Sequence, residues 1–160
     1  SYAFPTEERG LGNYILDALG AEEESLITTY DLGTFPMRVQ SLNRTLIDKV
    51  FAVCDYYMQD KAHRNARHLY DIYKLTEHVE IDDDFLKLVK EVRAHRIAMG
   101  SEIAPAAPLD VDILELVRKV CDEDFYKEDY RETTLKLISD SLEYEMLKKH
   151  YRELVEKVFE

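Results

Sequence analysis

The sequence is poor in residues that build covalent or metal-linked scaffolds. Its 160 residues include only two cysteines, Cys54 and Cys121, and neither belongs to a C-x-x-C pair or a Cys/His cluster. Both lie within apolar helical patterns, so we expect buried thiols. The five histidines lack a paired ligand spacing such as H-E-x-x-H. A histidine-built metal centre is therefore not expected.

Long apolar runs are also missing. No stretch approaches the roughly 20 uninterrupted apolar residues that a membrane-spanning helix needs. The N-terminus has no basic segment followed by an apolar one, so no secretory signal is visible. These absences predict a cytoplasmic protein without a membrane partner. The chain begins at Ser1 without an initiator Met, which suggests a processed or partial product.

The sequence has too little positive charge to coat nucleic acid along its whole surface, because its formal net charge is -12. The acidity lies mainly in residues 97–160, where Asp and Glu clearly outnumber Lys and Arg. Residues 61–96 are close to neutral. Any anionic ligand is therefore expected to meet the middle of the chain.

The pattern of elements predicts an α+β chain that is predominantly α-helical. Thr6, followed by two glutamates, is typical of a helix start, and Gly20 of a helix stop. The runs at 26–30 and 35–40 flank a turn signal and predict a small β hairpin, with Pro36 placing the second strand at an edge. A helical bundle is expected after it.

The rest of the chain reads as helices separated by short connections. Ser41 is expected to cap the first of them. Asp82, Asp83 and Asp84 can be read as a metal site, but without a metal-loop spacing we favour a helix N-terminus. A proline-containing stretch is expected to be a linker, and the last pattern to be divided in two. The predicted helices cover 42–58, 64–75, 85–99, 110–126 and 131–159.

One stretch imitates a nucleotidyltransferase motif. Gly100-Ser101 followed by Asp110-Val111-Asp112 resembles the Gly-Ser and D-x-D signature that holds triphosphate and magnesium. That chemistry needs a helix starting at Gly-Ser and a strand presenting both aspartates. Two prolines interrupt such a helix, and helical spacing follows Asp112. We therefore interpret Asp112 as a helix N-cap instead.

The segment "RNARHLYDIYKL" (64–75) has one polar and one apolar helical face. Its polar face carries an aspartate among cations, in the order Arg64, Arg67, Asp71, Lys74 and His78. An ordinary Arg67–Asp71 pair would be worth only ~0.3–0.5 kcal/mol. The preceding helix places Lys49 beside its apolar face without an acid at i+3 or i+4. Lys49 therefore needs a partner from elsewhere, and Asp71 and a ligand anion are the candidates.

The stretch "SLNRTLIDKVFAVCDYYMQDKAHRNARHLYDIYKL" resembles the latter part of the AbiEii/AbiGii toxin family of nucleotidyltransferases. That family pairs an "RTL..K" helix with an "R..YD..KL" helix, and the spacing from Lys49 to Asp71 fits it. Weaker agreement extends to "YAFPTEERG" before and "DEDFYKEDYRETT" after. The family's Gly-Ser helix start, D-x-D strand and third carboxylate are absent from this chain and would lie upstream of Ser1. Position 68 is His where an acid is expected in many relatives.

The resemblance implies the latter half of a polymerase-β-like nucleotidyltransferase. Residues 1–40 would be a remnant of the transferase core with an edge hairpin, and residues 41–160 a helical domain. Lys49 and Asp71 would be the catalytic residues, whereas Arg64, Arg67 and His68 would bind substrate. Magnesium and a nucleoside triphosphate would act in the complete enzyme, and this chain alone would bind no metal and be inactive. An antitoxin protein and tRNA are the implied partners.

The alternative is a helical protein-interaction module without catalysis. In that case the 64–75 face and the acidic C-terminal helices would contact a protein partner, and no upstream residues would be needed.

Overall fold

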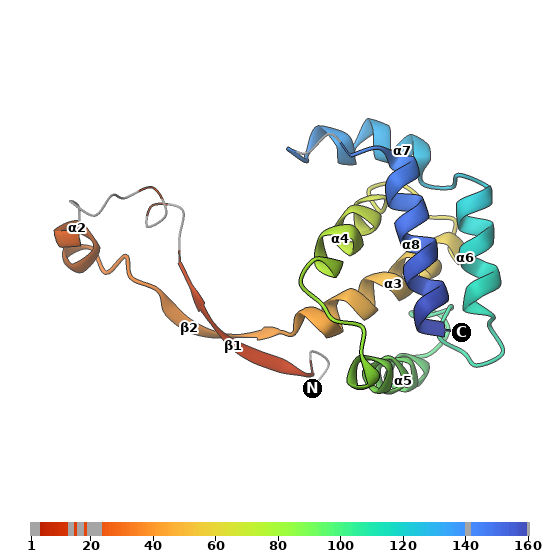
Figure 1. The fold of residues 1–160 in the computed structure, drawn as a ribbon, viewed down its shortest axis with the longest axis horizontal. Helices are drawn as coiled ribbons and strands as arrows, with labels where there is room; N and C mark the ends of the chain where they lie inside the picture. The colour runs from red at the N-terminus through yellow and green to blue at the C-terminus, as the bar shows by residue number, and fades with distance from the viewer. Residues whose placement is uncertain (1–3, 13–14, 16–17, 19–23, 140–141, 160) are drawn as a thin grey trace. The chain divides into compact units, whose positions relative to one another are not determined.

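The computed structural model describes residues 4–12, 15, 18, 24–139 and 142–159. The chain divides into two compact units, residues 1–41 and 42–160 (Figure 1). The fold class is the predicted one, α+β and mostly helical, with a small antiparallel hairpin near the N-terminus.

The first unit contains a two-stranded antiparallel ribbon. Its strands are β1 (Thr6–Leu11) and β2 (Phe35–Gln40), paired from Thr6 opposite Gln40 to Leu11 opposite Phe35. Opposite residues share a face, so one face gathers most of the apolar side chains of the ribbon and also carries the ion pair of Glu7 and Arg9. The apolar set is Leu11, Phe35, Met37 and Val39.

Two predictions for this unit are wrong. The helix expected to begin at Thr6 is β1, and the run expected to be a strand at 26–30 lies largely in a short helix, α2 (Glu24–Thr29). The partner of β2 is thus a segment from far earlier in the chain, and this long-range pairing overrides the local preference of Thr6 for a helix start. The stop predicted at Gly20 lies outside the described residues.

The second unit is a bundle of helices. Its first helix matches its predicted bounds, and the connection after α5 is the predicted linker. The predicted segment 131–159 is interrupted, but it contains only the end of α7, a short 3-10 helix and α8, because α7 begins before it. The bounds are α3 (Leu42–Met58), α4 (Arg67–Thr76), α5 (Asp83–Ala98), α6 (Ile113–Asp122), α7 (Lys127–Glu132), η2 (Thr134–Lys136) and α8 (Tyr144–Phe159).

Helix α3 is the centre of the bundle. It contacts α4, α5 and α6, while α8 contacts α4 and α6 (Figure 1). Leu46 and Phe51 of α3 are completely buried, and burial of each such side chain contributes about 1.5–3 kcal/mol. Two buried tyrosine hydroxyls donate to α3 carbonyls: Tyr126 to Val53 at 2.7 Å, and Tyr151 to Val50 at 3.1 Å. These bonds hold α3 within the bundle.

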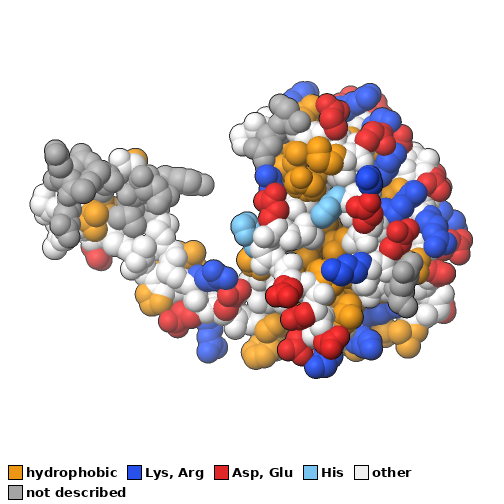
Figure 2. Space-filling view, viewed as in Figure 1, with side chains coloured by type: hydrophobic (Ala, Val, Ile, Leu, Met, Phe, Trp, Pro, Cys, Tyr) orange, Lys and Arg blue, Asp and Glu red, His pale blue; other side chains and the backbone are white. Residues whose placement is uncertain are grey.

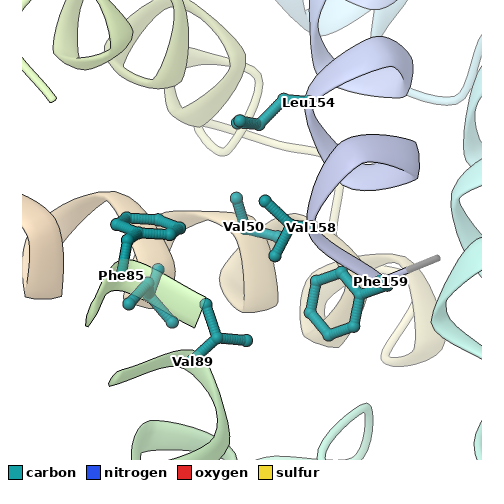
Figure 3. A pocket seen from close by; sticks show the side chains of 7 residues that line it. Val50, Phe85, Val89, Leu154, Val158 and Phe159 are labelled. Atoms are coloured by element: carbon teal, nitrogen blue, oxygen red, sulfur yellow. The ribbon is translucent and has the colours of Figure 1, made fainter. Parts of the chain in front are cut away.

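A small cavity in this bundle is lined only by apolar side chains. It lies where α3, α5 and α8 meet, and Phe85, Val158 and Phe159 are among its walls (Figure 3). Such a lining offers no hydrogen-bond partner to a phosphate or a metal ion. The polar chemistry of the bundle is therefore found elsewhere.

Candidate functional site

Lys49 of α3 and Asp71 of α4 meet in a direct ion pair. The Lys49 Nζ donates to Asp71 Oδ2 at 2.7 Å, with the two side chains 25% and 34% exposed. The prediction that these residues lie together on adjacent helices is confirmed. Because the pair is partly exposed to water, its contribution to stability is at most about 1 kcal/mol. The simplest local interpretation of the segment paired Asp71 with Arg67. In the structure Asp71 pairs with Lys49 instead.

His68 lies beside this pair and stacks on Tyr56 of α3. The two ring centroids are 5.6 Å apart and the planes differ by 6°. Burial, together with the nearby Lys49 cation, lowers the pKa of His68 to about 4, so the ring is neutral at pH 7. Both ring nitrogens are buried without a hydrogen-bond partner in the described part of the chain.

The two predicted substrate-binding arginines are exposed at the start of α4. Arg67 is the first residue of the helix, whereas Arg64 precedes it and has a left-handed backbone with φ of 63°. The single helical face predicted from Arg64 to His78 is therefore wrong at both ends, because α4 spans only Arg67–Thr76. The apolar side of the prediction agrees with the structure, since Leu69 and Ile72 are buried.

A second ionic cluster involving α3 was not predicted from the sequence. Arg44 Nε donates to Asp48 Oδ2 at 2.9 Å, and Arg96 of α5 reaches Asp48 Oδ1 at 3.1 Å. Arg96 also pairs with Asp55, whose other oxygen accepts the Ala106 amide at 2.9 Å. Asp48 and Asp55 are seven residues apart and lie on one helix face, but Arg96 comes much later in the chain. The sequence pattern of α3 alone does not identify this partner.

The stretch with Gly100-Ser101 and Asp110-Val111-Asp112 lacks the geometry that the nucleotidyltransferase motif needs, as predicted. Gly100 follows the end of α5 with φ of 90°, and no strand follows it within the described residues. Asp112 caps α6 by accepting the Glu115 amide at 3.0 Å. Asp82 likewise caps α5 by accepting the Phe85 amide at 2.8 Å. Both capping interpretations are confirmed.

The described residues do not fit a metal centre. Across residues 4–12, 15, 18, 24–139 and 142–159, no group of three His, Cys, Asp or Glu side chains is arranged to hold a metal ion. Cys54 and Cys121 are buried free thiols, as predicted, and burial raises the pKa of Cys54 to about 12. No described helix is long and apolar enough to span a membrane.

A sequence model for the nucleotidyl transferase AbiEii toxin of type IV toxin–antitoxin systems matches residues 1–160. The chain belongs to the AbiEii toxin family. Membership confirms the resemblance carried by the α3 and α4 segments, and it identifies a nucleotidyltransferase toxin family whose systems include an antitoxin. Comparisons with curated proteins and with solved structures gave no match.

Proposed function

We propose that this chain is the portion of an AbiEii nucleotidyltransferase toxin that binds substrate phosphate, with tRNA as the acceptor of the transferred nucleotide. The observation that supports this proposal is the Lys49–Asp71 pair. Its side chains are partly exposed to water, and it joins the two helices that carry the family resemblance. A solvent-reachable ammonium can exchange a carboxylate partner for a phosphate oxygen.

Each residue of the site has a role in this proposal. Lys49 neutralises phosphate charge as it develops, and Asp71 holds the lysine in position. Arg67 and Arg64, both exposed, contact phosphates of the nucleotide or of the acceptor. His68 contributes a neutral ring, since it has no charge of its own at pH 7 to oppose that of Lys49.

Magnesium and the nucleoside triphosphate belong to the complete enzyme in this proposal. The described residues offer no metal-binding cluster, so the carboxylates would come from a segment upstream of residue 1. We call the protein with that segment the complete toxin. The 160-residue chain alone is expected to be inactive, because one lysine and one aspartate do not replace metal-centred charge stabilisation.

The exposed apolar side chains of the ribbon support the proposal that residues 1–40 belong to the transferase core. Phe35 and Met37, on the face that gathers most of its apolar side chains, are 56% and 49% exposed. An isolated two-stranded ribbon is marginally stable in water. We therefore assign this face to packing against the remainder of the core in the complete toxin.

Labelled nucleotide transfer tests the proposal. The complete toxin and the 160-residue chain are each incubated with one labelled nucleoside triphosphate at a time, magnesium and bulk tRNA. We expect label on tRNA with the complete toxin alone. Incorporation by the short chain that is lost on changing Asp110 and Asp112 would contradict the proposal, as would a complete toxin that transfers no nucleotide.

The second candidate is a helical protein-interaction module. Exposed apolar residues of the bundle favour it, among them Ile103 at 60% and Leu109 at 80% exposed. Acylation of Lys49 separates the two functions. Protection of Lys49 by a nucleoside triphosphate supports the transferase, whereas an extensive apolar interface without a nucleotide effect supports the module.

A further inference from the structure

The turn that leads into α4 is held by a carboxylate from a distant helix. Asp129 of α7 accepts the Arg64 amide through Oδ1 at 2.8 Å and the Ala66 amide through Oδ2 at 3.0 Å. The Asp129 side chain is only 5% exposed, and more than 60 residues of sequence separate it from the turn. One carboxylate therefore fixes two successive points of the backbone just before Arg67.

The turn has local hydrogen bonds, since the Asn65, His68 and Leu69 amides donate to the Ala62, Asn65 and Ala66 carbonyls. The Arg64 and Ala66 amides, in contrast, are held by Asp129. Ala66 occupies the N-cap position of α4 and makes no side-chain cap hydrogen bond, so no side chain at that position fixes the entry of the chain into the helix. Arg64 has a left-handed backbone, which is unfavourable for a residue with a Cβ atom. The negative charge of Asp129 also lies at the favourable, N-terminal end of the helix dipole.

Asp129 is itself fixed by its own neighbourhood. The Thr133 hydroxyl donates to Asp129 Oδ1 at 3.0 Å and to the Asp129 carbonyl at 2.7 Å. The Nδ1 atom of His63 lies 3.6 Å from the same carboxylate. These contacts leave the carboxylate little freedom to turn away from the Arg64 and Ala66 amides.

We infer that Asp129 is a positioning residue for the site on α4. Arg67 and His68 directly follow Ala66, whose amide Asp129 holds, and Asp71 comes one turn later, where it meets Lys49. Displacement of the first turn of α4 would move Arg67 and His68 and change the alignment of Asp71 with Lys49. The inference rests on the proposed function, since it assigns Asp129 to the same transferase site.

The test uses Asp129→Asn in the complete toxin. Asparagine keeps the size of the side chain but has one acceptor oxygen, so one of the two backbone hydrogen bonds is lost. We expect kcat per folded molecule to fall at least about 10-fold with a smaller change in KM, because removing a positioning contact misaligns groups in the transition state. Amide exchange at Arg64, Ala66 and the first turn of α4 should accelerate, while exchange in α6 stays unchanged.

Asp112→Asn is the matched control. It makes the same chemical change at the N-cap of α6, a helix that carries none of the site residues. Because Asp112 accepts a single amide there, asparagine can keep that hydrogen bond, so exchange in α6 should change little and transfer should stay unchanged. If Asp129→Asn fails to fold, Thr133→Val replaces it, because this variant removes the hydroxyl that orients the carboxylate. A several-fold fall in kcat with faster exchange at Arg64 and Ala66 is then expected.

The outcomes separate this inference from the proposed function. Wild-type transfer by Asp129→Asn or Thr133→Val, together with loss of transfer in Lys49→Ala, would overturn the positioning role alone. Wild-type transfer by Lys49→Ala would overturn the proposed function, and the inference would fail with it. A loss of activity that merely follows the folded fraction would make Asp129 a structural cap.

Discussion

Helix α3 carries two ionic clusters that differ sharply in their access to water. The Lys49 and Asp71 side chains are 25% and 34% exposed, whereas those of Arg96 and Asp55 are 8% and 6% exposed. At 100° per residue, Lys49 lies about 100° around the helix from Asp48. Charge on one helix is therefore divided between a buried network and a pair that is open to water.

The clusters also differ in how fully their hydrogen-bonding groups are used. Asp55 accepts from Arg96 and from the Ala106 amide, and Arg96 spans Asp55 and Asp48. Lys49 has three donor hydrogens, and Asp71 is its hydrogen-bond partner among the described residues. Lys49 therefore has donors left for a phosphate. The visible face of the bundle mixes both signs of charge (Figure 2), so net charge alone does not mark this position.

After Lys49→Ala, the largest effect is expected from Asp71→Asn in the complete toxin. We expect transfer to fall by at least about 100-fold, because Lys49 loses the charge that holds it. The free energy of unfolding should change by no more than about 1 kcal/mol, as for other half-exposed pairs. Transfer assays and urea unfolding measure the two quantities. Unchanged transfer would show that the pair is not functional.

Asp55→Ala disrupts the buried cluster and should lower stability more than transfer. The variant leaves Arg96 buried without its partner and the Ala106 amide without an acceptor, so we expect a loss of about 3–5 kcal/mol in the free energy of unfolding. Transfer per folded molecule should stay near the wild-type value. Near wild-type stability with greatly reduced transfer per folded molecule would reverse the roles that we assign to the two clusters.

The pH dependence of stability should report the buried His68 ring. Its pKa is about 4 in the folded protein, below the ordinary value of 6.5, so the unfolded chain binds the proton more readily. The resulting stability is fully present above pH 6.5 and is lost as pH falls toward 4, by at most about 3 kcal/mol. Burial also lowers the pKa of His150, which adds to the decline.

His68→Phe isolates that contribution. Phenylalanine can keep the stack on Tyr56 but does not titrate, so part of the decline between pH 6.5 and 4 should disappear. The control is His78→Phe, at an exposed position after α4, which should keep the decline. Urea unfolding at several pH values measures both variants. An unchanged decline in His68→Phe would contradict the assignment.

The smallest effect is expected from Asp83→Asn. Asp83 is the first residue of α5 and contributes through the helix dipole, whereas the capping hydrogen bond comes from Asp82. We expect at most about 1 kcal/mol of destabilisation and no change in transfer. Asp82→Ala should cost more than Asp83→Asn. A greater loss of stability in Asp83→Asn than in Asp82→Ala would contradict the assignment of the cap to Asp82.

Much of the helical unit could be predicted because its signals are local. The bounds predicted for α3 from its apolar periodicity are the observed ones. The aspartates that cap α5 and α6 directly precede the helices that they cap. Lys49 could be matched to Asp71 because a lysine beside an apolar face needs a partner, and the family resemblance supplied the candidate.

The remaining features depend on contacts between distant parts of the chain. β1 forms by pairing with β2, so the glutamates after Thr6 misled the local interpretation. Arg96 and Asp129 reach their partners across more than 40 residues. The sequence next to each residue therefore does not indicate which partner its side chain binds. Their roles follow from the packing of α5 and α7.

The central claim is that the Lys49–Asp71 pair serves function more than folding. Transfer per folded molecule by Lys49→Ala in the complete toxin tests it most directly, with the unfolding midpoint recorded on the same samples. We predict that transfer is abolished while the midpoint stays close to that of the wild type. An unfolded variant whose residual transfer falls only in proportion to the folded fraction would contradict the claim and make the pair a structural one.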